Sequence, residues 1–287
     1  MIEVECGVKA FDVHELLCHY VARELGFYAE EGLRVSVRDR TFTPDGELPQ
    51  TSYFQVACGA AFLGRRQGLP FKVVFAACTR PMFWLHGAPE IERVEDLAGT
   101  RVATYAPVGP PHFFSRLTLL RHSLDPDRDL SFEPMRDDAA RLGMLVAGEV
   151  QGAVASSAVS PVAVQRRGLR TLALLGDHVR FVTTGIGLFE RMLDEQPEVV
   201  AALVRCFARA LEAIHHEPDR VLPVAAQLLG EPGAVVRATY DLVLPCFTQD
   251  GRAPHDELQR WIDDLEEVLP EDGHVDAREL YDFSLVI

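Results

Sequence analysis

The sequence contains little that would attract a polyanion or place the chain in a membrane. Of its 287 residues, 43 are acidic and 28 are basic, so the formal net charge is −15. So acidic a chain offers no long basic face to a phosphate backbone. It also has no uninterrupted apolar run near the ~20 residues that a membrane-spanning helix needs. We therefore expect no nucleic-acid partner and no membrane span.

Paired cysteines and a secretion signal are also missing. The six cysteines are scattered, without a CxxC motif or paired spacing, which favours reduced, mostly buried thiols over a disulfide framework. The first residues, MIEVECGVKAF, lack the positive, apolar and small-residue regions of a signal peptide. The sequence as printed predicts a cytoplasmic protein; if a leader has been removed from it, we expect the periplasm instead.

The sequence does show a regular alternation of strand-like and helix-like segments. Strands are predicted at 2–9, 33–38, 71–77, 99–105, 152–156 and 171–175, and helices at 14–25, 94–97, 113–123, 137–147 and 161–167. After residue 189 only helices are predicted, at 198–216, 218–229, 232–244, 255–268 and 277–282. This order predicts mainly parallel sheets with helices on both faces, and ligands beyond the carboxyl ends of the strands.

Three segments resemble the alkanesulfonate-binding and thiamine-pyrimidine-synthase-like family of the type II periplasmic-binding-protein fold. They are YVARELGFYAEEGLRV (20–35), VEDLAGTRVA (94–103) and LVAGEVQGAV (145–154), followed by a similar stretch at 189–197. The resemblance implies two α/β lobes around a ligand cleft, with C-terminal helices mainly on the first lobe. We expect lobe I to comprise residues 1–80 and 182–287, lobe II to comprise 81–181, and crossovers near 79–84 and 178–184.

The resemblance also implies a function. The family's solute-binding members predict reversible binding of an anionic or heteroaromatic small molecule, with an ABC transporter permease as a partner. Relatives on the same scaffold that are enzymes leave a cytoplasmic synthase, decarboxylase or desulfinase as the alternative. The chain lacks both the cysteine-rich motif of the pyrimidine synthases and the Arg-x-Gly-Gly motif of the sulfinate desulfinases, and it has Gln151 where the family usually has an acid. A ligand-sensing or scaffold module is a third interpretation.

Polar residues follow the predicted strands, where a cleft ligand would lie. Lys9 and its neighbours Phe11, Asp12 and His14 follow the first strand; Lys9 offers a charge to an anion and Asp12 is suited to cap a helix. Ser156 and Ser157 follow a later strand and offer hydroxyl groups. The competing interpretation is a surface lysine and ordinary helix caps.

Two further segments are candidates for ligand contacts. The stretch that contains Tyr105, Gly109 and His112 leads into a helix whose free N–H groups are suited to an anion, although a stiff connection without a ligand explains it equally well. On the crossovers, Arg80 would bind an acidic group, Trp84 would stack on a ring, and Thr184 would add a hydroxyl. Arg80 and Trp84 should then face one cavity; a structural ion pair and a packing tryptophan are the alternatives.

An enzyme would have to rest on isolated residues, because no Walker, GxGxxG, HExxH, GxSxG or kinase motif occurs. The candidates for catalysis are Lys9, His14, Cys18, Cys58 and His112. His14 and Cys18 are four residues apart and could share a helix face as metal ligands, but no third ligand is in register. The sequence therefore predicts no metal site and identifies no cofactor.

Overall fold

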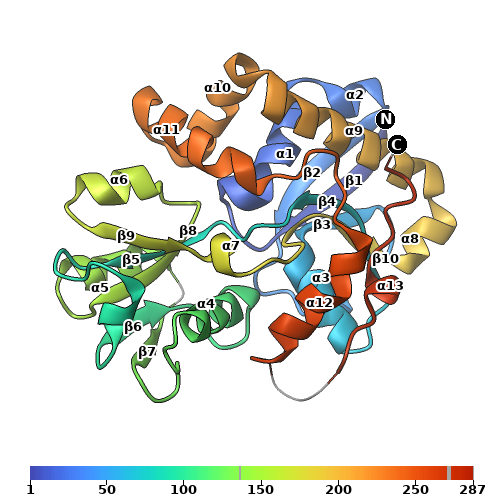
Figure 1. The fold of residues 1–287 in the computed structure, drawn as a ribbon. Helices are drawn as coiled ribbons and strands as arrows, with labels where there is room; N and C mark the ends of the chain where they lie inside the picture. Colours follow the sequence, from blue (N-terminus) through green and yellow to red (C-terminus); the bar gives the residue numbers. More distant parts are fainter. Residues whose placement is uncertain (136, 270–272, 287) are drawn as a thin grey trace.

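The computed structural model describes residues 1–135, 137–269 and 273–286 and contains two five-stranded sheets (Figure 1). The first sheet has the order β2-β1-β3-β10-β4, and the second has the order β7-β6-β8-β5-β9. The strands are β1 (Ile2–Val8), β2 (Leu33–Asp39), β3 (Tyr53–Ala57), β4 (Phe71–Cys78), β5 (Phe83–Gly87), β6 (Arg101–Thr104), β7 (Ser131–Pro134), β8 (Gly152–Ser156), β9 (Arg170–Leu174) and β10 (Thr184–Phe189). Helices flank both sheets, which confirms the predicted α/β class.

Helices connect the strands and then form the whole C-terminal part. Those between strands are α1 (Val13–Glu24), α2 (Phe27–Glu30), α3 (Cys58–Arg66), α4 (Pro110–Arg121), α5 (Asp138–Val146), α6 (Pro161–Arg166) and α7 (Leu175–His178), with short 3-10 turns η1 (Asp45–Glu47) and η2 (Val94–Leu97). The later ones are α8 (Glu190–Glu195), α9 (Pro197–His216), α10 (Pro218–Leu229), α11 (Gly233–Val243), η3 (Leu244–Cys246), α12 (His255–Glu266) and α13 (Ala277–Leu280). None of these described helices is both long and apolar enough to cross a membrane.

The sheets are less parallel than the sequence predicts. β1 runs parallel to β2 and β3, and β6 runs parallel to β7 and β8. However, β10 is antiparallel to β3 and β4, and β5 is antiparallel to β8 and β9. β5 and β10 are the strands that enter each sheet directly after the chain crosses from the other sheet. Each therefore starts at the edge of its sheet where the chain crosses over, and runs in the opposite direction to the strands beside it.

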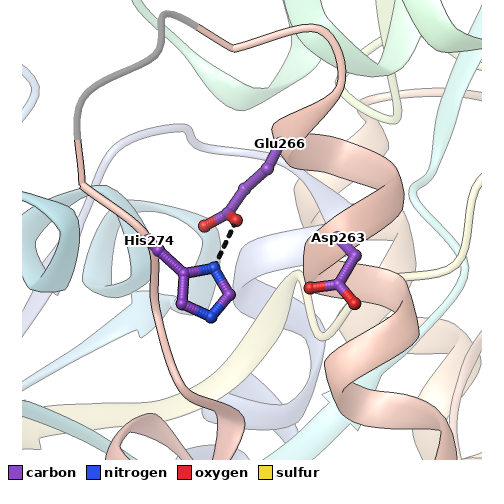
Figure 2. Close-up of side chains that lie close together, drawn as sticks. All are labelled: Asp263, Glu266 and His274. Atoms are coloured by element: carbon purple, nitrogen blue, oxygen red, sulfur yellow. Dashed lines mark hydrogen bonds and ion pairs between the residues drawn. The ribbon is translucent and has the colours of Figure 1, made fainter.

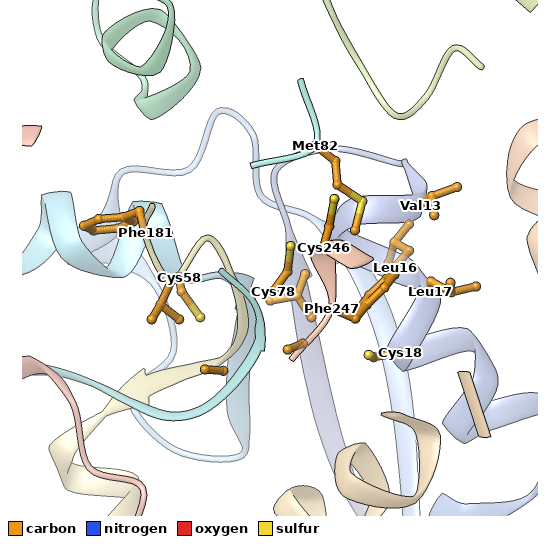
Figure 3. Close-up of a cluster of buried hydrophobic side chains, with 14 of the residues drawn as sticks. Val13, Leu16, Leu17, Cys18, Cys58, Cys78, Met82, Phe181, Cys246 and Phe247 are labelled. Atoms are coloured by element: carbon orange, nitrogen blue, oxygen red, sulfur yellow. The ribbon is translucent and has the colours of Figure 1, made fainter. Parts of the chain in front are cut away.

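Helix α1 shows why the first sheet forms as the sequence predicts. Asp12 caps it, with its side chain accepting a hydrogen bond from the Glu15 backbone N–H at 2.8 Å. Apolar residues recur on the face of α1 that packs into the core, among them Leu16 and Leu17, which are fully buried. In the same cluster Met82, on the crossing segment, points toward Cys246 (Figure 3). All six cysteines are buried free thiols, as predicted.

The C-terminal helices cover the first sheet and also reach the second. Helix α9 packs against α1, α2 and β4, and α10 packs against α1. Helix α11 also contacts α6, and α12 contacts α4. The chain passes between the sheets at residues 79–82 and 179–183, close to the expected crossovers. The lobe boundaries at 80/81 and 181/182 stay a prediction.

Candidate functional site

A cavity of about 450 Å³ lies where elements of both sheets meet. We call the first sheet with its helices the first half and the second sheet with its helices the second half. The first half lines the cavity with the loop after β1 and the starts of α1 and α3. The second half lines it with Phe83, Tyr105, the loop before α4 and Ser156. Thr183 and Thr184, where the chain returns to the first sheet, complete the lining. The cavity has the size of a small-molecule site and lies beyond the carboxyl ends of β1, β3, β6 and β8.

Carboxyl groups in and beside this cavity have raised pKa values. Glu15 lines it and accepts hydrogen bonds through Oε2 from the backbone N–H groups of Lys9 and Ala10, at 2.9 and 3.0 Å. Burial, with a further contribution from the nearby Asp12 carboxylate, raises the pKa of Glu15 to about 8. Burial also raises the pKa of Asp12, to about 6. Near pH 7 Glu15 is therefore mainly neutral, whereas Asp12 is mainly ionised.

A third acid, Asp138, is held by a dense hydrogen-bond network at the cavity wall. Its carboxylate accepts from the backbone N–H and the hydroxyl of Ser156, at 2.9 and 2.7 Å, and from the Tyr105 hydroxyl at 3.1 Å. The fully buried Arg141 also pairs with it and lies over the Tyr105 ring, 3.7 Å from the ring centroid. Arg141 therefore compensates Asp138 and fixes the position of Tyr105.

Aromatic rings also line the cavity. The Phe83 ring meets the rings of His14 and Tyr105 edge-on, with centroids 5.5 and 5.6 Å apart. Phe11 lines the cavity while 53% exposed, so it lies at the mouth. His14 is buried with its Nε2 2.6 Å from the Thr183 hydroxyl, and burial lowers its pKa to about 3. The imidazole is therefore neutral across the physiological range.

The single cation among the described lining residues, Lys9, is already engaged. Its ammonium donates to the carbonyl oxygens of Arg40 and Thr43, at 2.9 and 3.3 Å, and pairs with the Asp45 carboxylate at 3.3 Å. Asp45 also lines the cavity. An anionic ligand would have to compete with this carboxylate for Lys9.

Seven of the twelve residues proposed from the sequence line the cavity: Lys9, Phe11, His14, Tyr105, Gly109, Ser156 and Thr184. Two others are buried within the protein next to it. Asp12 is 1% exposed and caps α1, and the Ser157 hydroxyl accepts the His14 backbone N–H at 2.8 Å. Both therefore position residues of the cavity wall without lining it. Ligand contact by all these residues stays a prediction.

The remaining three lie elsewhere, which corrects the expected common cavity of Arg80 and Trp84. Arg80 pairs with Asp177 and donates to the Pro245 carbonyl oxygen at 3.3 Å, so it is a structural ion pair. Trp84 is 4% exposed within β5, where strand pairing on both sides makes it a core residue. His112 is buried at the start of α4, with Nδ1 3.2 Å from the Tyr105 carbonyl oxygen.

The two thiols considered for catalysis are also outside the cavity lining. Cys18 and Cys58 are buried, and burial raises the pKa of Cys18 to about 12 and that of Cys58 well above its usual value. Neither forms the thiolate that a nucleophile or a metal ligand needs. His14, whose ring faces Thr183 and Phe83, does not form a metal pair with Cys18.

A second group of possible metal ligands lies on α12 and the segment after it (Figure 2). Asp263, Glu266 and His274 bring donor atoms within 4.8 Å of one another. The Glu266 carboxylate is already used, because Arg66 and His274 both pair with it, at 3.2 and 2.8 Å. This arrangement ties residue 274 to α12 as an ion-pair cluster.

The comparisons with known proteins agree with this architecture. A family model described as NMT1/THI5 like matches residues 14–221, more than half of the chain. The chain belongs to the NMT1/THI5-like family. A curated relative, the riboflavin-binding protein RibY of Chloroflexus aurantiacus, is 26% identical over 225 residues, which cover 74% of this chain and 62% of that protein. The chain thus spans about 62% of the length of this relative.

Two solved structures show the same fold as this NMT1/THI5-like chain. The periplasmic aliphatic sulphonate binding protein SsuA from Escherichia coli matches with a TM-score of 0.76 and 14% identity, covering 97% of this chain and 91% of that one. The desulfurization enzyme DSZB matches with a TM-score of 0.69 and 17% identity, covering 98% and 96%. The resemblance to alkanesulfonate-binding proteins and the two-lobed type II periplasmic-binding-protein fold are thereby confirmed.

Glu15, Asp138 and Phe83 are among the residues of this family member's cavity that the sequence does not predict. A signal existed for Glu15, because Asp12-Val13-His14-Glu15 has the acid three residues after the cap that is typical of a capping box. No comparable signal marks Asp138, whose position at the cavity depends on Arg141 and Ser156, brought to it by the fold.

Proposed function

We propose that this protein reversibly binds a small, uncharged heteroaromatic molecule in the cavity between its two halves. The observation that carries the proposal is the composition of the described lining: aromatic rings, carboxyl groups, and Lys9 as the only cation, already paired with Asp45. Rings stack and carboxyl groups accept or donate hydrogen bonds, whereas a sulfonate would find no unpaired positive charge. The name of the relative RibY supports a ring-shaped ligand.

A thermal-shift comparison tests this proposal. We expect riboflavin or an aminopyrimidine to raise the melting temperature at pH 7, because a ligand that binds only the folded state stabilises it by mass action, and ethanesulfonate to leave it unchanged. A shift with ethanesulfonate alone would overturn the heteroaromatic assignment.

Phe11 provides a variant for this test that should fold normally. Since Phe11 is 53% exposed at the cavity, Phe11→Ala should weaken binding of the active heterocycle about tenfold through the lost ring contact. Phe42→Ala is the matched control, because Phe42 is 70% exposed and does not line the cavity. Equal affinities for the two variants would place the ligand somewhere else.

In this proposal the two halves are the lobes 1–80 with 182–287 and 81–181, which close over the ligand. The protein would then act as the ligand-binding component of an ABC-type import system, with a permease as its partner, outside the cytoplasm. The family membership and the fold shared with SsuA support this. A permease encoded beside the gene, and retained by the liganded protein in a pull-down, is the expected result; retention equal with and without ligand would contradict it.

An enzyme on the same scaffold is the second candidate, favoured by the fold shared with DSZB and by Lys9 and His14 at the cavity. Against it, the Lys9 ammonium contacts three oxygen atoms and the His14 ring contacts Thr183, so neither is poised as a nucleophile. We expect every bound heterocycle to be recovered unchanged after long incubation, as measured by mass spectrometry. Appearance of a product would favour the enzyme.

A further inference from the structure

Glu15 presents an unused oxygen to the cavity. Its side chain accepts two hydrogen bonds from the described residues, from the backbone N–H groups of Lys9 and Ala10, and both go to Oε2. Oε1 accepts no hydrogen bond from the described part of the chain, and Glu15 is a lining residue. An oxygen that accepts from two N–H groups keeps both lone pairs occupied, so a proton on this carboxyl belongs on Oε1.

The surroundings of Glu15 favour that proton. Its ionisable neighbours are Asp12 on the same helical turn, Lys9 in the preceding loop, Cys6 on β1 and Cys58 at the start of α3, and Asp45 and Asp138 share the cavity. Burial is the main cause that raises the pKa of Glu15, to about 8, and the negative charge of Asp12 adds to it. The two backbone N–H groups and the Lys9 ammonium lower the pKa but do not cancel the rise. At pH 7 the group is mainly a carboxylic acid.

Thr184 is a second polar residue of the cavity lining that lacks a hydrogen-bond partner among the described residues. It is 2% exposed. Buried hydroxyl groups are normally hydrogen-bonded, because leaving one unpaired costs free energy. The Thr184 oxygen is covered by the surrounding protein, so the ligand's hydrogen bond is assigned to Oε1 of Glu15.

We propose that Glu15 determines which ligands this cavity accepts: as a neutral acid it donates the hydrogen on Oε1 to an acceptor atom, a ring nitrogen or a carbonyl oxygen, of an uncharged heterocycle. The inference rests on the proposed function and adds its chemical selectivity and its control by pH. Loss of the proton replaces a donor by a negative charge that faces the ligand's own acceptor atom. The cavity therefore binds its ligand in neutral or mildly acidic solution and releases it in alkaline solution.

Calorimetric titration with riboflavin as the probe tests this inference. Because the neutral fraction of an acid of pKa about 8 falls from about 0.9 at pH 7 to about 0.1 at pH 9, the dissociation constant of the wild-type protein should rise about tenfold over this range. Glu15→Gln keeps an oxygen for the two backbone N–H groups and an N–H donor for the ligand, without a titrating proton. Its dissociation constant should match that of the wild type at pH 7 and remain flat to pH 9.

Glu24→Gln is the matched control, because Glu24 ends the same helix and, within the described part of the chain, pairs only with Arg23, away from the cavity. This variant should keep the tenfold rise. A wild-type dissociation constant that does not change with pH, or a Glu15→Gln profile that follows the wild type, overturns the role of Glu15 while ligand binding itself stands. Absence of binding to the wild-type protein at pH 7, for riboflavin and for an aminopyrimidine alike, overturns the proposed function and this inference together.

Discussion

At the scale of single residues, the acids next to the cavity make stability depend on pH in an unusual direction. The folded protein raises the pKa of Glu15 to about 8 and that of Asp12 to about 6, whereas both titrate near 4 in an unfolded chain. The folded state then binds protons more tightly than the unfolded state. The resulting stabilisation is complete below pH 4 and is lost as the pH rises through 6 and 8.

Glu15→Gln removes most of this dependence. We expect the variant to melt below or level with the wild type at pH 5, and above it at pH 8.5 by about 2–4 °C for each 1 kcal/mol that ionisation of Glu15 costs. Differential scanning calorimetry at the two values measures the difference. A difference between the two melting temperatures that stays constant from pH 5 to pH 8.5 would show that the carboxyl is an ordinary ionised group.

Arg141 is the residue on which the second half of the cavity wall depends. Fully buried, it donates to the carbonyl oxygens of Val154 and Met135 at 2.6 and 2.5 Å and pairs with Asp138. Arg141→Met leaves the Asp138 charge without its partner and should lower the free energy of unfolding by about 3–5 kcal/mol. Urea denaturation measures this.

The control for Arg141 is Arg237→Met, which breaks an exposed pair with Asp241 on α11 and should change stability little. An Arg141→Met variant as stable as this control would mean that Asp138 is protonated or reaches water. Nothing in the sequence distinguishes Arg141 from the many exposed arginines, because its burial follows from the packing of α5 on β8.

At the scale of the elements, local pattern was enough wherever one face of an element meets the core. Strand β1, helix α1 with its Asp12 cap, and α9 to α12 all follow from apolar periodicity and from proline and glycine at their ends. The crossing strands β5 and β10 do not, since both are buried along their whole length and contain glycine. Their antiparallel direction depends on the path between the sheets, which no local pattern encodes.

Some cavity residues follow from local pattern and others do not. The sequence locates the loops that follow strands, and these loops contain the lining residues Lys9, Phe11, His14, Tyr105 and Ser156. Arg80 and Trp84 are sequence candidates for ligand contacts because they lie on a predicted crossing segment. In the structure the Arg80 side chain pairs with Asp177 and the Trp84 side chain is buried in the core, so neither lines the cavity. Their partners, Asp177 and the strands β8 and β9, lie ~70–95 residues away in sequence, beyond the reach of local patterns.

Strand β10 also provides a sharp test of packing. Gly185 lies so close to β4 that an added Cβ would be 1.8 Å from the Phe75 carbonyl oxygen. Gly185→Ala should therefore destabilise the protein by about 1–3 kcal/mol or more, because the backbone must move.

The control is Gly143→Ala, in α5 where a Cβ meets nothing within 4 Å, which should stabilise the protein by about 0.5–1 kcal/mol. Thermal unfolding of the two variants should shift in opposite directions; a shared direction would contradict the tight β4–β10 approach.

At the scale of the whole molecule, the two halves are held together by buried polar contacts as well as by the cavity wall. The His14 backbone N–H reaches Ser157, and the Ser160 hydroxyl, which caps α6, lies 2.6 Å from that of Thr239 on α11. Such contacts favour the closed arrangement seen here, and in the proposed hinge motion they separate when the halves open.

Thr239→Val tests this coupling away from the ligand. It removes the hydroxyl contact with Ser160 at nearly constant volume, so the closed form should become less populated and riboflavin affinity should fall by about threefold to tenfold. Calorimetry gives the affinity, and small-angle scattering of the unliganded variant should show a larger radius of gyration than the wild type. An unchanged radius together with unchanged affinity would mean that α11 does not restrain the second half.

We propose above that an uncharged heteroaromatic ligand binds between the two halves of the protein. Calorimetric titration of the wild-type protein at pH 7, with riboflavin in one experiment and ethanesulfonate in another, measures this binding. The cavity's rings, its carboxyl groups and its paired lysine predict saturable binding of riboflavin with one site per chain, and no heat above dilution from the sulfonate. Saturable binding of ethanesulfonate without binding of riboflavin would contradict the claim.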